Sequence, residues 1–104
     1  MTAAQYSVYI VECSDSSLYT GIATDVARRL KEHAGNSRGA KYLRSRGPLK
    51  LVYAQRVGSR SLAQHLESRV KRLSRAGKLE LIAGRLDLLA LAAESQVSVD
   101  ASSP

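Results

Sequence analysis

The sequence predicts an α+β fold, in which a small three-stranded antiparallel sheet is flanked by helices in the order ββαβαα. Two β-rich runs surround a short polar turn, a third alternating run follows a Gly-Pro pair, and other segments space their apolar residues three or four positions apart. With 104 residues, the chain has room for one small domain. We expect residues 1–94 to form this domain and the polar residues 95–104 to form a disordered tail.

Turn-forming and helix-capping residues separate the individual elements. Strands are expected over residues 6–12, 18–22 and 49–57. Helices are expected over residues 26–33, 60–73 and 76–83, with shorter helical turns over 39–46 and 86–93. Thr24 or Asp25 is suited to cap the first helix, and Gly58-Ser59 introduces the second. The apolar residues of the second helix form one stripe, made of Leu62, Leu66, Val70 and Leu73.

Composition restricts the class of protein and its surroundings. No apolar run approaches the roughly 18 residues needed to cross a bilayer. The first residues lack the basic start and apolar stretch of a secretory signal. A single cysteine, Cys13, has no partner for an internal disulfide, which is typical of a reducing compartment. We therefore expect a soluble, cytoplasmic protein with no membrane partner.

The basic residues are concentrated in the middle of the chain. Residues 24–78 hold 15 of the 16 Lys and Arg residues against three acids, a net charge of +12 for this stretch. Such a concentration of positive charge favours a polyanion as partner, and nucleic acid is the obvious one. A solvated basic surface that only keeps the protein soluble is the alternative.

Several short motifs occur in an order that is similar to one known family. They are Ser7-Val8-Tyr9 and Tyr19-Thr20-Gly21 on the two hairpin strands, the arginine-bearing helix of residues 24–33, Gly39-Ala40-Lys41-Tyr42, and Ser74-Arg75. Across residues 6–82 the chain resembles the GIY-YIG endonuclease superfamily, and more specifically its small stand-alone bacterial YhbQ-like group. Ser7 and Thr20 replace a glycine and an isoleucine of the name-giving tripeptides, and no asparagine follows Asn36, although larger family members have one.

Two tyrosines of the hairpin are candidate catalytic residues. If the turn is centred near Ser14, Tyr9 and Tyr19 face each other across the two strands. A phenol has a pKa of about 10 and is a poor base at neutral pH unless a neighbour assists it. The resemblance implies that Tyr9 activates the attacking water and that Tyr19 orients the phosphate. The alternative is that both are ordinary residues of a half-buried strand.

Arg29 and His33 are the candidates on the first helix. Their spacing of four residues places them on one helix face together with Val26, and that face is expected to turn toward the sheet. A guanidinium can grip a phosphate and stabilise the charge that builds up in the transition state. The resemblance implies this role for Arg29, and it implies that His33 helps to deprotonate Tyr9. A helix that binds phosphates without chemistry is the alternative.

Glu67 is the candidate metal ligand. It is the only acid between Glu32 and Glu80, and it borders the apolar stripe of the second helix. One carboxylate in this position suits a hard cation, because phosphate oxygens and waters can complete the octahedron of Mg²⁺. The resemblance assigns Mg²⁺ or Mn²⁺ to Glu67. The alternative is a salt bridge to a nearby basic side chain, for which Arg60, Arg69 and Lys71 are available.

The remaining basic residues are candidates for binding the nucleic acid. The predicted contacts are Arg28, Arg38, Lys41, Tyr42, Arg44, Arg46 and Arg72. Tyr42 is placed among them because an aromatic ring can stack on a base. Taken with the resemblance, these residues predict a metal-dependent endonuclease, with DNA favoured over RNA although the sequence does not decide between them. We expect selectivity for the structure of the nucleic acid or a weak sequence preference, since no recognition helix stands out. The resemblance alone implies a role in DNA repair or maintenance.

Two other readings of the sequence stay open. A non-catalytic nucleic-acid-binding module would keep the scaffold and the basic surface, and its binding would not depend on Mg²⁺. A protein-interaction domain would use the second helix and Leu86-Asp87-Leu88-Leu89 as a docking surface. The sequence leaves the oligomeric state undetermined.

Overall fold

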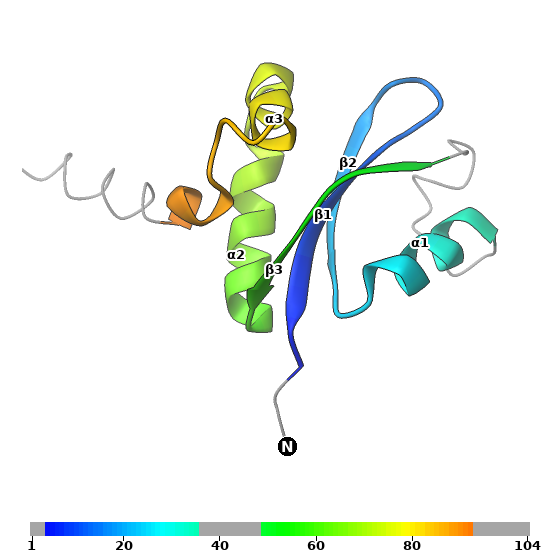
Figure 1. Cartoon of the computed structure of the whole chain (residues 1–104), viewed down its shortest axis with the longest axis horizontal. Coiled ribbons are helices and arrows are strands. Elements are labelled where there is room, and N and C mark those ends of the chain that lie inside the picture. Colours follow the sequence, from blue (N-terminus) through cyan, green and yellow to red (C-terminus); the bar gives the residue numbers. More distant parts are fainter. Residues whose placement is uncertain (1–3, 36–48, 93–104) are drawn as a thin grey trace, which may run out of the picture.

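The computed structural model describes residues 4–35 and 49–92, except for the side chains of residues 33–35. Its elements, shown in Figure 1, are β1 (Tyr6–Glu12), β2 (Leu18–Ala23), α1 (Val26–Gly35), β3 (Lys50–Gly58), α2 (Arg60–Lys71) and α3 (Arg75–Ile82). The predicted α+β fold and its order ββαβαα are confirmed. The short helix expected over residues 39–46 and the tail expected over residues 95–104 lie outside the described residues. No helix in the described ranges is long and apolar enough to span a bilayer.

The three strands form one antiparallel sheet in the order β2-β1-β3. Figure 1 shows α2 and α3 on one side of this sheet and α1 on the other. Val8 and Ile10 of the central strand belong to the larger apolar cluster, together with residues of α2 and α3. Tyr9 belongs to a smaller cluster, against which α1 packs through Val26 and Leu30. Alternate residues of β1 thus face opposite layers, as the pleat of a strand requires.

The turn of the hairpin is centred one residue later than expected, so the pairing of the two strands is shifted by two residues. Glu12 pairs with Leu18, so the turn is centred on Asp15 and not on Ser14. The Asp15 carboxylate accepts hydrogen bonds from the backbone nitrogen and the Oγ of Ser17, at 3.1 and 2.6 Å. An aspartate that binds the chain two residues further on is a frequent way to fix a tight turn.

This register places the two candidate tyrosines diagonally rather than opposite each other. Tyr9 pairs with Gly21, whereas Tyr19 pairs with Val11. The expectation that Tyr9 and Tyr19 stand directly across the hairpin is therefore wrong. Both rings still lie on the side of the sheet that α1 covers, because both residues pack in the smaller cluster.

The predicted apolar stripe of α2 is confirmed. Leu66 and Val70 are fully buried, and Leu62 and Leu73 are partly buried against the same cluster. The helix begins after Ser59, whose hydroxyl accepts a hydrogen bond from the backbone nitrogen of Leu62 at 3.1 Å. A side chain that satisfies a free amide at a helix start in this way stabilises the helix by about 1 kcal/mol.

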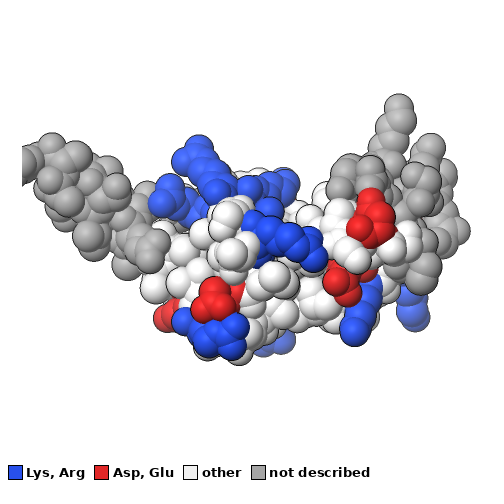
Figure 2. Space-filling model, turned by 90° about the horizontal axis from the view of Figure 1, so that it is seen from above, with Lys and Arg blue, Asp and Glu red and all other residues white. Residues whose placement is uncertain are grey.

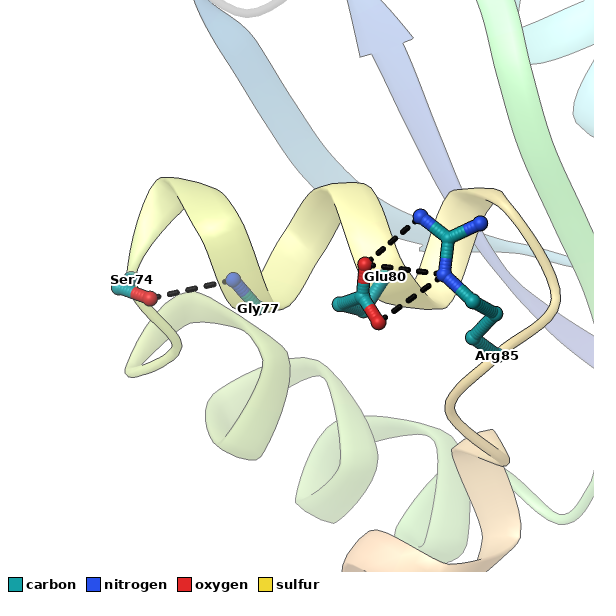
Figure 3. Close-up of polar contacts among 4 residues, drawn as sticks. All are labelled: Ser74, Gly77, Glu80 and Arg85. Atoms are coloured by element: carbon teal, nitrogen blue, oxygen red, sulfur yellow. Dashed lines mark hydrogen bonds and ion pairs between the residues drawn. The ribbon is translucent and has the colours of Figure 1, made fainter.

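Polar contacts fix both ends of α3 (Figure 3). The Ser74 hydroxyl accepts a hydrogen bond from the backbone nitrogen of Gly77 at 3.1 Å, which caps the start of the helix. Beyond its end, Arg85 donates to the Glu80 carboxylate, with 2.7 Å between Nη2 and Oε2. Both partners of this pair are well exposed, so it adds little to the stability of the fold.

The segment after α3 completes the larger cluster instead of forming a docking surface. Leu88 is fully buried and Leu91 is 2% exposed, and both pack in that cluster. Leu89 is the only exposed leucine among residues 86–89. The protein-docking reading of this segment is therefore wrong for Leu88, whose side chain already has its partners inside the fold.

Candidate active site

The hydroxyl end of Tyr9 lies over the neighbouring strand, at a glycine. Tyr9 is only 1% exposed, and Gly21 is its partner in the β1–β2 register. A Cβ atom at position 21 would lie 2.6 Å from Tyr9 Oη and 2.7 Å from Tyr9 Cζ. Gly21 therefore leaves the space that the phenol occupies. It was not among the predicted site residues, although a glycine inside a strand often marks such a close approach.

Arg29 reaches this phenol from α1. The helix is capped by Asp25, whose carboxylate accepts a hydrogen bond from the backbone nitrogen of Arg28 at 3.1 Å. One turn further on, Arg29 Nη1 lies 3.1 Å from Glu32 Oε1, and the guanidinium also makes a hydrogen bond with the Tyr9 side chain. The Arg29 side chain remains 44% exposed. It therefore contacts the buried tyrosine and is still open to a phosphate from solvent.

Glu32, which was not among the predicted site residues, forms ion pairs with both arginines of α1. Its two carboxylate oxygens bind different arginines, since Arg28 Nε lies 3.5 Å from Oε2 and Arg29 Nη1 lies 3.1 Å from Oε1. The two arginines are not equivalent, because the Arg28 side chain is 77% exposed. The spacing of three residues between Arg29 and Glu32 would have indicated this contact, since such pairs are neighbours on a helix.

The surroundings of Tyr9 keep its phenol protonated. Burial raises the pKa of Tyr9 to about 12, and the nearby Tyr19 and Glu67 act in the same direction. The positive charge of Arg29 and its hydrogen bond act in the opposite direction. At neutral pH the phenol is therefore neutral in the free protein. It can serve as a base only if binding of substrate or a neighbouring base removes its proton.

Glu67 lies near both tyrosines, at the edge of β2. Its side chain is 23% exposed, and Oε2 lies 3.3 Å from Lys71 Nζ, one turn further along α2. Lys71 Nζ in turn lies 6.0 Å from the centre of the Tyr19 ring. The salt bridge that was the alternative for Glu67 is therefore present, and Lys71 is its partner. Glu67 is also close enough to Tyr9 for its charge to raise the pKa of that phenol.

The structure thus brings together four of the five predicted catalytic residues, namely Tyr9, Tyr19, Arg29 and Glu67. His33 belongs to α1, and its side chain lies outside the described residues. The same holds for five predicted nucleic-acid contacts, which are Arg38, Lys41, Tyr42, Arg44 and Arg46. The other two, Arg28 and Arg72, are exposed, on α1 and just beyond α2.

The exposed charge of the described part is mainly basic. Seen from the end that carries the hairpin turn, Lys and Arg side chains lie along one edge and across the middle of the described surface, and others lie beside the small Asp and Glu patches (Figure 2). A pocket of about 250 Å³ borders the active site between the end of β2 and α1, and Arg28, Arg29 and Glu32 contribute to its lining. This pocket is smaller than the roughly 300–1,000 Å³ usual for small-molecule ligands, and its lining includes the acids Asp25 and Glu32 as well as the two arginines.

The donor set fits a divalent cation that arrives with its substrate. Within the described ranges, no group of three or more His, Cys, Asp and Glu residues could hold a metal ion. Glu67 offers one half-buried carboxylate. Magnesium accepts such a site, since it commonly binds one or two carboxylates and takes its other ligands from water and phosphate.

Comparison with known proteins identifies the family of this chain. The family model described as the GIY-YIG catalytic domain matches residues 5–80. A UPF0213 protein of Syntrophus aciditrophicus is 49% identical over 72% of this chain and 86% of its own length. The UPF0213 protein YhbQ of Salmonella typhimurium is 44% identical over 88% of this chain and 91% of its own.

Two solved structures share the fold. The solution NMR structure of the UPF0213 protein BH0048 from Bacillus halodurans is 48% identical, with a TM-score of 0.50 over 76% of this chain and 83% of that one. The NMR structure of the protein EF2693 from E. faecalis is 30% identical, with a TM-score of 0.55 over 80% of this chain and 88% of that one. Because the family model matches residues 5–80 and UPF0213 proteins that are 44–49% identical cover most of the chain, the chain belongs to the GIY-YIG catalytic domain family, in its group of small UPF0213 proteins.

Proposed function

We propose that this protein is a Mg²⁺- or Mn²⁺-dependent endonuclease that hydrolyses phosphodiester bonds of DNA in the cytoplasm. The observation that carries the proposal is the meeting of Tyr9, Arg29 and Glu67 at the edge of β2. These residues come from three separate elements, and Arg29 and Glu67 both act on the pKa of Tyr9. Titratable groups that perturb one another at an exposed edge are typical of a functional site.

Each predicted catalytic residue has a separate role in the proposed hydrolysis. Arg29 binds the scissile phosphate and stabilises the negative charge that builds up on its oxygens. Tyr9, once deprotonated, takes a proton from the attacking water, and His33 is the group that receives the phenol proton. Tyr19 orients the phosphate. Glu67 would hold the divalent cation, which would supply stabilisation of the negative charge that develops at the phosphate.

The substrate class follows from what the described surface offers. The exposed basic side chains suit phosphates, and contacts to phosphates carry no sequence information. We therefore favour selection for DNA structure over selection for sequence, in a repair or maintenance role. Membership in a nuclease family supports action on nucleic acid, and DNA is the form we propose.

The raised pKa of Tyr9 predicts a particular dependence of cleavage on pH. Only the phenolate can take a proton from water, and with a pKa of about 12 its fraction grows about tenfold for each pH unit across the neutral range. If His33 receives the phenol proton, the rate rises less steeply with pH than the phenolate fraction does. We therefore expect a steeper rise of the rate between about pH 7 and pH 9 in His33→Ala than in the wild type.

Single-turnover cleavage measured across this pH range checks the expectation, with Tyr9→Phe as the inactive control. A flat profile in an active His33→Ala protein would contradict a role for the Tyr9 phenolate.

A cleavage assay tests the proposed function directly. Linear, nicked, flapped and branched DNA, and RNA of the same sequences, are incubated with the full chain in Mg²⁺ or in EDTA. We expect cleavage of at least one branched or flapped DNA, lost in EDTA and in Glu67→Gln. Glu80→Gln is the matched control, because Glu80 is an exposed acid on α3 that pairs with Arg85.

The non-catalytic binding module is the second candidate, and one contact favours it. Glu67 already has a cation beside it in Lys71, as a purely structural acid would. Tight DNA binding without cleavage, unchanged by EDTA and by Glu67→Gln, would establish that candidate and overturn the nuclease. Such binding would weaken steeply as salt is added.

A further inference from the structure

We propose that Lys71 has two successive roles at this site. In the metal-free protein its ammonium group neutralises Glu67, and when a divalent cation takes Glu67 the ammonium group binds a phosphate of the nucleic acid instead. This inference rests on the proposed function, because it requires that Glu67 hold the cation. Lys71 was not among the predicted site residues.

The first role follows from the ion pair itself. Lys71 Nζ lies 3.3 Å from Glu67 Oε2, and the two residues are four apart on α2, where side chains meet without distortion. The acid is the more enclosed partner, since its side chain is 23% exposed against 53% for Lys71. The carboxylate is therefore held against the protein, and the ammonium group stands at its open side.

The second role follows from what else surrounds the ammonium group. Lys71 Nζ lies 6.0 Å from the centre of the Tyr19 ring, a distance at which a cation is still attracted to the ring face. When it leaves Glu67, the ammonium group thus keeps a contact at the active site. Tyr19 is the residue expected to orient the phosphate, so Lys71 stays beside the place where the phosphate binds.

Charge decides the order of the two roles. A single carboxylate cannot neutralise both an ammonium group and a divalent cation a few ångströms apart, and the two cations repel each other. An incoming phosphate relieves this repulsion, since its oxygens can contact the metal and the ammonium group together. Lys71 therefore lowers the affinity for the metal ion in the free protein and raises the affinity for the phosphate in the complex.

The experiment compares the effect of Lys71→Met on these two ligands. Binding of Mn²⁺ to the full chain without DNA is followed by electron paramagnetic resonance of the free ion. Binding of a fluorescein-labelled flapped DNA is followed by anisotropy in Ca²⁺, which takes oxygen ligands as Mg²⁺ does. Thermal melting checks that each variant is folded.

We expect effects of opposite sign in Lys71→Met. The affinity for Mn²⁺ rises about two- to fivefold, because the competing cation is gone. The affinity for DNA falls, and the slope of its dependence on salt decreases by about one, as expected for one lost phosphate contact. Arg72→Met is the matched control, since Arg72 is exposed at the next position, and it should weaken DNA binding without affecting Mn²⁺.

Each other outcome overturns the inference. If neither affinity changes, the pair is an ordinary surface salt bridge. A loss of DNA affinity alone makes Lys71 a plain phosphate contact like Arg72, and a gain of Mn²⁺ affinity alone makes it only a competitor. If Glu67→Gln binds Mn²⁺ as well as the wild type does, Glu67 is not the metal ligand. The proposed metal site is then wrong, and the proposed roles of Lys71 are wrong with it.

Discussion

Replacing Arg29 by alanine is expected to lower the single-turnover rate of DNA cleavage by about 100- to 1,000-fold, the loss usual when one preorganised charge-stabilising donor is removed. Arg29 contacts the buried Tyr9 and is still open to solvent, so its loss removes both the phosphate contact and the group that lowers the pKa of the phenol. Arg28→Ala is expected to lower the rate less than about fivefold, because this neighbour is 77% exposed and contacts only Glu32 among the described ion pairs.

Comparing Arg29→Ala with Arg28→Ala separates a local effect at the site from a general loss of positive charge. Both remove one positive charge from the same helix, so a general loss of attraction for DNA would affect them equally. Equal losses in Arg28→Ala and Arg29→Ala would show that α1 only holds the backbone of the DNA. Arg29→Lys adds a third point, since a lysine keeps the charge but not the planar fork of donors.

Gly21→Ala is expected to damage both stability and activity, although alanine is the smallest possible side chain. Its Cβ would lie 2.6 Å from Tyr9 Oη, and Tyr9 is buried and cannot swing into solvent. Forcing one extra carbon into a packed site typically costs about 1–3 kcal/mol of unfolding free energy. A displacement of the hydroxyl by about 1 Å can lower the cleavage rate about 100-fold.

Chemical denaturation and single-turnover cleavage measure the two effects. Removing the ring should remove the clash, so Gly21→Ala should cost much less stability in a Tyr9→Leu background than in the wild type. Gly77→Ala is the matched control, because its Cβ would lie 3.3 Å from Leu73 Cβ, at a helical position where alanine is preferred to glycine. Equal destabilisation by Gly21→Ala in both backgrounds would refute the proposed contact.

The order of elements could be predicted from the sequence because each depends on local patterns. The stripe of α2 and its Ser59 cap are visible within one stretch of chain, and both are confirmed. The register of the hairpin depends on which residue of a polar turn forms the decisive hydrogen bonds. Any of the four consecutive polar residues 14–17 could have formed these bonds. In the structure Asp15 forms them, and Tyr9 therefore pairs with Gly21.

The partners within the site were harder to predict, because they depend on how helices lie against the sheet. Glu67 had several basic residues nearby in sequence, and helix geometry favours the one four residues on, Lys71, over Arg69, two residues on. That Lys71 also lies over Tyr19 depends on how α2 packs against β2. The burial of Leu88 depends likewise on the tertiary fold, since an amphipathic segment looks the same on a surface and in a core.

The division of the site between the two faces of the sheet also affects the protein while it is being synthesised. The hairpin and α1 carry the tyrosines and Arg29, and all of them leave the ribosome before Glu67 does. They can meet that carboxylate only after α2 has packed against the opposite face and closed the larger cluster. If the proposed nuclease function is correct, a nascent or partly unfolded chain would carry Arg29 without Glu67 in place, and only the folded protein could cleave DNA.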